Sequence, residues 1–182
     1  MQVDLSKFNN DDYNPGSAFR RFFWYFFNVL FLINPWNPFS GLKKVVLRLF
    51  GAKIGEGVVI KPGVNIKYPW LLEIGENTWI GERVWIDNLA KVVIGSNVCI
   101  SQGALLLCGN HDYKKSTFDL IAKEIVLEDG SWVGAMSTVT GGVTLKSHSI
   151  LSAGSVTSKD LEAFKIYRGN PAEFVRERHI EE

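Results

Sequence analysis

The sequence predicts an all-β parallel β-helix, a solenoid of stacked three-sided coils, and a six-residue step between aliphatic side chains is the main observation behind it. The step holds for three groups of three between Ile54 and Leu106, with two inserted residues between groups, and resumes from Leu127 to Leu151. An α-helix would place residues six apart on opposing faces, so an ordinary helix is excluded. The positions are Ile54, Ile60, Ile66, Ile74, Ile80, Ile86, Ile94, Ile100, Leu106, Leu127, Val133, Val139, Leu145 and Leu151.

Small or β-branched residues stand two places before most of these aliphatics, as Val58 and Val64 do. This period of two is that of a strand with alternate side chains on one face, so both sets are expected to point inward. Glycine follows many of the aliphatics, and we expect it to supply the permissive backbone of a corner. Three strands and three corners make one coil, which buries what the coil beneath it exposes.

Three segments divide the chain. We expect an aromatic-rich helical segment over residues 1–50, the β-helix over residues 51–160, and a short capping segment with a charged tail over residues 161–182. The GNPA turn from Gly169 to Ala172 is expected to end the solenoid and start the cap, because the open end of a solenoid must be covered.

Three stretches outside the bare repeat carry a family resemblance: WIDNLAKVVIGSNVCISQGALLLCGNHDY, SAGSVTSKD and YRGNPAEFV. With the repeat, they make about residues 50–178 resemble the hexapeptide-repeat acyltransferases, and within them the galactoside, maltose and colanic-acid-biosynthesis O-acetyltransferases. The resemblance implies a left-handed β-helix, a homotrimer with active sites between subunits, and acetyl-CoA as co-substrate. We therefore expect an O-acetyltransferase that acts on a sugar or a surface-polysaccharide precursor.

An interruption of the repeat points to a catalytic residue. The step from Leu106 to Leu127 is 21 residues, so a loop of about residues 109–124 must leave the coil, and function concentrates in such loops. His111 stands at its start, and imidazole can take the proton of a hydroxyl that attacks a thioester. A solvated loop histidine is the alternative. The family carries its catalytic histidine at this GNHDY position, which implies that His111 is the general base.

Candidate acceptor-binding residues lie near this loop. Asp87 and Asn88 fall one coil below its base, where they would orient the imidazole or hold an acceptor hydroxyl, unless they are a corner pair chosen for turn geometry. Arg83 stands where the galactoside enzymes align an asparagine, which leaves the acceptor contacts open. Trp85 points outward as a sugar-stacking surface or a trimer contact, and Asp112 lies beside the base.

The donor site is implied by the resemblance alone. Coenzyme A in these trimers lies along the groove between subunits. Small residues there let the pantetheine approach the coil, and cations meet its phosphates, with a solvated surface charge as the alternative for each cation. The matching positions are Ala135, Ala153, Ser158, Lys159 and Arg176.

Composition excludes several classes. The chain has 20 Lys and Arg against 19 Asp and Glu, so no strong field favours nucleic acid as a partner. Cys99 and Cys108 fit a reduced compartment and no disulfide framework. The histidines are 37 and 31 residues apart, unlike the ligands of zinc-type β-helix carbonic anhydrases, so no metal is expected. His148 and His179 are expected to be solvated.

The aromatic stretch FFWYFFNVLFLI, residues 22–33, leaves two alternatives. As a helix it spans about 18 Å against a hydrocarbon core of about 30 Å, so it does not cross a bilayer. Acidic residues precede it and no A-x-A follows, so export is not expected and the protein is placed in the cytoplasm. Either the helix packs on the end of the domain, or its aromatic face rests on the inner face of the membrane, with a lipid-linked saccharide as acceptor. The neighbouring cations are Arg20, Arg21, Lys43, Lys44 and Arg48.

Two other functions remain open at this stage. One is an N-acyltransferase that acts on an amino sugar, distinguished by an amide product instead of an ester. The other is a catalytically silent solenoid scaffold, against which the intact GNHDY sequence speaks.

Overall fold

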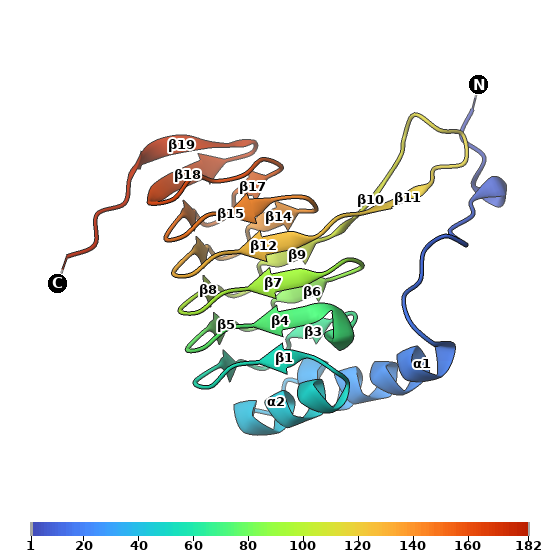
Figure 1. The fold of residues 1–182 in the computed structure, drawn as a ribbon, viewed down its shortest axis with the longest axis horizontal. Helices are drawn as coiled ribbons and strands as arrows, with labels where there is room; N and C mark the ends of the chain where they lie inside the picture. Colours follow the sequence, from blue (N-terminus) through green and yellow to red (C-terminus); the bar gives the residue numbers. More distant parts are fainter. Residues whose placement is uncertain (1, 182) are drawn as a thin grey trace.

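Stacked three-sided coils form the body of the computed structural model, which describes residues 2–181 (Figure 1). Each coil gives one short strand to each of three walls, and neighbouring coil strands pair in parallel. The first wall contains β1 (Lys53–Ile54), β4 (Leu72–Ile74), β7 (Val92–Ile94), β12 (Ile125–Leu127) and β15 (Thr144–Leu145). The second contains β2 (Val59–Ile60), β5 (Trp79–Ile80), β8 (Cys99–Ile100), β13 (Trp132–Val133), β16 (Ile150–Leu151), β18 (Lys165–Gly169) and β19 (Ala172–Glu177). The third contains β3 (Asn65–Ile66), β6 (Trp85–Asp87), β9 (Leu105–Leu107), β14 (Thr138–Thr140) and β17 (Val156–Thr157).

Equivalent residues of successive coils lie above one another, which fixes the core. Ile66 pairs with Ile86, and Ile86 pairs with Leu106, as the insertion of two residues per coil requires. Every aliphatic at the six-residue step from Ile54 to Leu151 is buried, and so are Val58 and Val64. The predicted parallel β-helix, with helices before it and a capping segment after it, is therefore confirmed.

The corners differ from expectation in one respect. The left-handed backbone falls on residues such as Asn77 (φ +54°), Arg83 (φ +57°) and His148 (φ +59°), and not on the glycine that follows an aliphatic. A Cβ on Gly75 would lie 2.6 Å from the carbonyl carbon of Gly95 in the next coil. The predicted role of these glycines as permissive corners is wrong, because what they provide is room for the backbone of the neighbouring coil.

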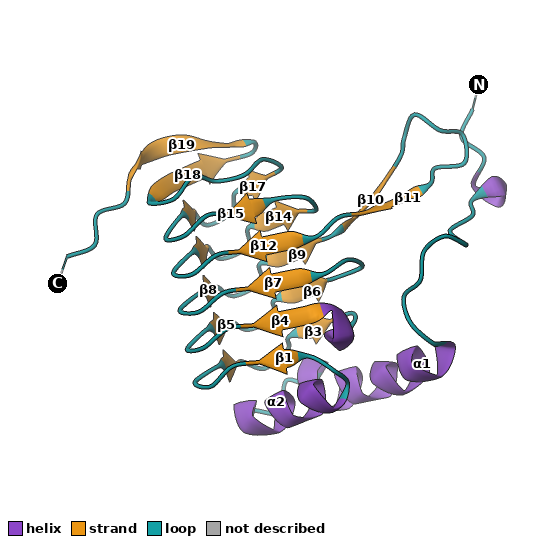
Figure 2. Cartoon of the chain, in the orientation of Figure 1, coloured by secondary structure: helices purple, strands orange, loops and turns teal. Residues whose placement is uncertain are grey.

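Two helices lie across one end of the solenoid (Figures 1 and 2). Helix α1 (Ala18–Phe27) begins after Ser17, whose hydroxyl accepts a hydrogen bond from Arg20 N, and continues as the π-helical turn η2 (Asn28–Ile33). Pro35 disfavours helical backbone at the residue before it, which ends this segment. Helix α2 (Ser40–Leu49) then leads into the first coil. No helix between residues 2 and 181 is long and apolar enough to cross a membrane.

Side chains of this helical layer cap the open edge of the first coil. Coil N–H groups donate toward the next coil, as Gly55 N does to Ile74 O at 2.8 Å, so the corresponding carbonyls of the first coil have no coil below to donate to them. One carbonyl in each wall receives a side-chain donor instead. The pairs are Arg48 Nη2 with Ile54 O at 2.7 Å, Lys43 Nζ with Ile60 O at 3.3 Å, and Trp24 Nε1 with Ile66 O at 2.9 Å.

The other end of the solenoid is covered by an antiparallel hairpin. Strand β18 pairs in parallel with β16 of the last full coil, and β19 pairs antiparallel with β18. The turn of the hairpin contains the cis peptide bond Asn170–Pro171. The chain also forms the short 3-10 turns η1 (Leu5–Lys7) and η3 (Pro69–Leu71).

A two-stranded ribbon projects from the side of the solenoid where the repeat is interrupted (Figure 1). It consists of β10 (Gly109–His111) and β11 (Leu120–Ala122), which pair antiparallel, and the chain re-enters the coil at β12. The N-terminal arm, residues 2–16, runs from α1 to the outer part of this ribbon, where Asp4 N donates to Ser116 O at 2.9 Å.

Candidate active site

His111 is held in a defined tautomer by the ribbon that carries it. Its Nδ1 lies 2.8 Å from the backbone carbonyl oxygen of Phe118. A carbonyl oxygen only accepts, so Nδ1 carries the proton and Nε2 retains its lone pair. The half-buried imidazole stacks on the Phe118 ring at 4.4 Å between centroids and 8° between planes. A neutral imidazole in this state can accept a proton at Nε2.

The backbone of the ribbon explains why the Phe118 carbonyl reaches the imidazole. His111 pairs with Leu120, and Asp112 N donates to Asp119 O at 2.8 Å, so the ribbon brings its two sides together at this point. Phe118 takes a left-handed conformation with φ +53°, which turns the chain back toward His111. No pattern in the sequence identifies this partner, because any residue supplies the same backbone carbonyl.

The N-terminal arm adds a second aromatic contact to the imidazole. The Phe8 ring meets the His111 ring edge-on, with centroids 5.9 Å apart. Tyr13 anchors the arm to the solenoid by donating its hydroxyl proton to Leu89 O at 2.6 Å, and burial raises the pKa of that hydroxyl. Sequence reasoning missed the arm, since its polar stretch has no periodicity that would place it on the ribbon.

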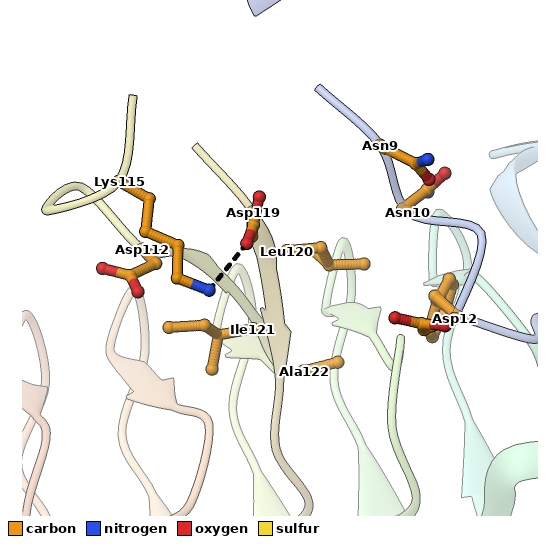
Figure 3. A pocket seen from close by; sticks show the side chains of 10 residues that line it. Asn9, Asn10, Asp12, Asp112, Lys115, Asp119, Leu120, Ile121 and Ala122 are labelled. Carbon is orange, nitrogen blue, oxygen red and sulfur yellow. Dashed lines mark hydrogen bonds and ion pairs between the residues drawn. The ribbon is translucent and has the colours of Figure 1, made fainter. Parts of the chain in front are cut away.

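A polar hollow of about 370 Å³ lies between the arm and the ribbon (Figure 3). On the ribbon side of the hollow, Lys115 and Asp119 pair at 2.9 Å, and hydrogen bonds from Thr117 and Lys115 lower the pKa of Asp119. Hydrogen-bond donors and acceptors, some of them charged, therefore line the same hollow. Such a lining suits a ligand that is rich in hydroxyl groups. The lining residues are Asn9, Asn10, Asp12, Tyr13, Asp112, Lys115, Asp119, Leu120, Ile121 and Ala122.

Asn88 and Asp87, which were both predicted to lie below the ribbon, have different surroundings. Asn88 is buried and uses its amide on one neighbour, accepting from Tyr68 N at 2.9 Å and donating to Tyr68 O at 2.6 Å. These two bonds fit the alternative of a corner pair chosen for turn geometry, because the oxygen and the NH2 group of the amide both bind the Tyr68 backbone. Asp87 lies under the base of the ribbon, where its Oδ2 would be 3.8 Å from a Cβ on Gly109, and it pairs with Lys67 at 3.0 Å.

The remaining acceptor candidates are placed in three different surroundings. Asp112 lines the polar hollow, and its Oδ1 accepts a hydrogen bond from Lys114 N at 3.1 Å. Arg83 is exposed at the corner before β6. Trp85 is exposed, as alternation predicts, and lines a separate hollow between α1 and the third wall, beside Tyr25. Of these three, the structure brings only Asp112 together with the His111 ribbon.

Three of the five donor candidates meet in one place. Ala135, Ala153 and Arg176 line a hollow of about 500 Å³ on the second wall, together with Trp132. Gly134 also lines this hollow, and a Cβ there would lie 2.4 Å from Ala153 N, so the glycine leaves room for the backbone of the next coil. Ser158 and Lys159 follow β17 on the third wall, are exposed, and do not line this hollow.

The other histidines and the cysteines take structural positions or lie at the surface. His148 stands at a corner as expected, yet the prediction that it is solvated is wrong, since it is half-buried and stacks on Phe164 at 4.6 Å. His179 is exposed in the C-terminal tail. Cys99 and Cys108 are free thiols, and burial raises the pKa of Cys108 to about 11. Within residues 2–181 no three His, Cys, Asp or Glu side chains are grouped to hold a metal ion.

Comparison with known proteins places the chain in a family. No family model matches it. Its fold superposes with a TM-score of 0.81 on the hexapeptide-repeat-containing acetyltransferase VCA0836 of Vibrio cholerae, at 24% identity, covering 91% of this chain and 96% of the other. Its sequence is 37% identical over 178 residues to the putative colanic acid biosynthesis acetyltransferase WcaF of Escherichia coli K12, covering 96% of this chain and 97% of that protein. The chain belongs to the hexapeptide-repeat acetyltransferases.

Other members of the hexapeptide-repeat acetyltransferases are more distant. The galactoside O-acetyltransferase of Escherichia coli K12 is 26% identical over 129 residues, which cover 69% of this chain and 64% of that protein. A galactoside acetyltransferase in complex with coenzyme A superposes with a TM-score of 0.77 at 22% identity, covering 88% of this chain and 81% of the other. These two matches extend the similarity in sequence and in fold to enzymes that act on galactosides.

Proposed function

We propose that the protein transfers the acetyl group of acetyl-CoA to a hydroxyl of a sugar or surface-polysaccharide precursor, with His111 as general base. The observation that carries the proposal is the hydrogen bond of His111 Nδ1 with the Phe118 carbonyl, because it leaves Nε2 free to accept a proton. The names of the relatives support the reaction class, since the 37% identical relative is a putative acetyltransferase of colanic acid biosynthesis.

The proposed reaction is a direct transfer. Nε2 of His111 takes the proton of the acceptor hydroxyl as that oxygen attacks the thioester carbonyl. The Phe118 carbonyl, which accepts from Nδ1, then stabilises the imidazolium. When the tetrahedral intermediate collapses, the C–S bond breaks and the imidazolium returns the proton to the thiolate. No acyl-enzyme is needed, because the thioester is already activated, and backbone N–H groups would stabilise the oxyanion.

The hollow that contains Ala135, Ala153 and Arg176 is the proposed donor site. The small side chains of Ala135 and Ala153 would leave room for the pantetheine chain, and Arg176 would pair with a phosphate of coenzyme A. Two structures with this fold were solved with the donor or its product, the Vibrio cholerae enzyme with acetyl-CoA and the galactoside enzyme with coenzyme A. The reaction requires no metal in this proposal.

A homotrimer would complete the donor site. Ser158 and Lys159 lie on a different wall from the hollow, so within one chain they do not face it. In a trimer with active sites between subunits, the third wall of one copy would meet the second wall of the next. The exposed Trp79 and Trp132 of the second wall fit such a contact surface. We assign Ser158 and Lys159 to the donor site of the neighbouring subunit.

The proposed acceptor site is the polar hollow between the arm and the ribbon. Its carboxylates, amides and Lys115 offer the donors and acceptors that sugar hydroxyls use, and Asp112 joins it to the His111 ribbon. Asp87 lies under the base of the ribbon and would complete this side of the site. We place the reaction in the cytoplasm, where the donor is available.

The activity test pairs acetyl-CoA with free, nucleotide-linked and lipid-linked sugars, and reads the products by mass. We expect a gain of one acetyl group on an acceptor hydroxyl, removed by mild alkali as an ester is. A product that resists alkali would indicate an amide and an amino-sugar acceptor. Failure to release coenzyme A with any acceptor, by a protein that binds acetyl-CoA, would favour a silent scaffold and contradict the proposal.

A further inference from the structure

The outward face of the helical layer is apolar although its inward face already packs on the solenoid. On the inward side, Trp24 donates to Ile66 O, Asn28 Nδ2 donates to Asn65 Oδ1 at 2.8 Å, and Lys43 donates to Ile60 O. A surface helix ordinarily turns its polar residues to the opposite side. Here the exposed side is made of large apolar side chains, which we call the aromatic end face: Phe19, Phe22, Phe23, Phe26, Val29, Leu30, Trp36, Phe39, Leu42, Val45 and Leu49.

The exposed apolar side chains of the two helices point the same way, away from the solenoid. The inward residues of both helices contact the same first coil, so the residues on the opposite sides of α1 and α2 both point away from the solenoid. Phe19, Phe22, Phe26 and Leu30 follow each other at helical spacing, and the Phe22 and Phe26 rings meet with centroids 5.0 Å apart. The exposed apolar side chains of α1, η2 and α2 therefore lie on the side of these helices that faces away from the coils, at the lower end of the molecule in Figure 1.

The charge around this surface has one sign. Residues 13–55 contain six Lys and Arg and no Asp or Glu, whereas the rest of the chain contains 14 basic and 19 acidic residues. Three of these cations, Arg20, Lys43 and Arg48, already bind groups of the chain itself, which corrects the prediction that they flank a membrane surface. Lys43 is buried, and Arg20 donates to Phe50 O and lies over the Trp70 ring. Arg48 is exposed, but it donates to Ile54 O and pairs with Glu56 at 3.4 Å. Arg21, which is exposed, and Lys44, which is half-buried, remain beside the aromatic end face.

Charge decides which occupant fits the aromatic end face. A second copy of the chain would bring the same cationic segment into contact with this one, and like charges would repel. An anionic bilayer surface offers acyl chains for the aromatic and aliphatic side chains and phosphate groups for Arg21 and Lys44. The helices are too short to span, which suits a helix that lies in the interface plane.

We propose that the aromatic end face docks the protein on an anionic bilayer surface, with α1, η2 and α2 lying in the plane of the interface. The axis of the solenoid then stands away from the bilayer. The His111 ribbon leaves the third coil, two coil steps of about 4.8 Å and one helix diameter of about 10 Å above the bilayer, or about 20 Å in all. Docking in this way leaves both proposed substrate hollows open to water.

The test is co-sedimentation of the full-length protein with vesicles of phosphatidylcholine alone and with 30% phosphatidylglycerol. The docking variant is the triple substitution Phe22→Gln, Phe26→Gln and Leu30→Gln, at exposed positions that face away from the coil. Phe174→Gln is the matched control, because Phe174 is an exposed aromatic on β19 at the opposite end. Far-UV circular dichroism and thermal unfolding show that each variant is folded.

Each surface cation should raise the affinity for anionic vesicles about fivefold. We therefore expect the wild type to bind the anionic vesicles at least about tenfold more tightly than the neutral ones. The triple variant should lose at least about tenfold in affinity, and Phe174→Gln should bind as the wild type does. Equal binding by the triple variant would overturn the proposal, as would a wild type that ignores anionic vesicles. A wild-type mass in solution twice that of the triple variant, by light scattering, would show instead that the face joins two copies.

Discussion

The cap on the open edge of the first coil allows a stability prediction with a worked magnitude. Trp24 is 2% exposed, and its indole N–H is the donor that reaches Ile66 O. Trp24→Phe keeps an aromatic ring in place and removes this donor. A buried acceptor left without a partner costs about 1–3 kcal/mol, and the smaller ring adds about 1 kcal/mol of lost packing. We expect a loss of about 2–4 kcal/mol in the free energy of unfolding.

For a chain of this size, that loss lowers the melting temperature by about 2–4 °C per kcal/mol. Thermal unfolding followed by circular dichroism, with urea unfolding as a second measure, tests it at one fixed protein concentration. The matched control is Trp36→Phe, the same chemical change at a residue that is 90% exposed. The control should stay within about 0.5 kcal/mol of the wild type. If the two variants lose the same stability, the capping argument is refuted.

Three further predictions follow from the described contacts. Burial lowers the pKa of Lys43 in the folded protein, so the unfolded chain binds this proton more tightly. The free energy of unfolding of the wild type, relative to that of Lys43→Met, should therefore rise as the pH increases toward 10.5. A difference that stays constant with pH would contradict this prediction. With a pKa of about 11, about one part in a thousand of Cys108 is thiolate at pH 8. Iodoacetamide should therefore modify Cys99 before Cys108 in the native protein, as measured by the mass of the two peptides. Equal rates of modification would contradict the burial of the Cys108 thiol. Arg176→Ala should raise the KM for acetyl-CoA about tenfold with little change in kcat, whereas Arg168→Ala, which removes an exposed arginine of β18 outside the hollow, should leave KM unchanged.

The solenoid was predictable because each coil repeats the same spacing of inward-facing aliphatic side chains. Any residue at the six-residue step must face inward, which is why positions as far apart as Ile54 and Leu151 could be assigned without a structure. The same counting identified the interruption that carries His111. Periodicity says less about backbone conformation, so the glycines after the aliphatics were given the wrong role, and the close approach of neighbouring coils explains them instead.

The site was harder to predict because its contacts are not periodic. Asn88 looks the same in the sequence whether its amide meets a ligand or the Tyr68 backbone. Lys43 reads as a surface cation, and only the missing coil beneath Ile60 explains why it is buried. The arm that brings Phe8 to His111 is about a hundred residues away in the chain, and nothing in its local pattern indicates that neighbour.

The central claim is that His111 removes the acceptor proton, and the rate of transfer in the His111→Ala and His111→Asn variants tests it most directly. The assay follows acetyl transfer from acetyl-CoA to the acceptor found by mass, with His179→Ala as the control, because His179 is exposed in the tail. We predict that both His111 variants lose about 10²–10⁴-fold in kcat, with little change in the KM for acetyl-CoA. The control should keep full activity. Either His111 variant working within a few-fold of the wild-type rate would contradict the assignment of this residue as the base.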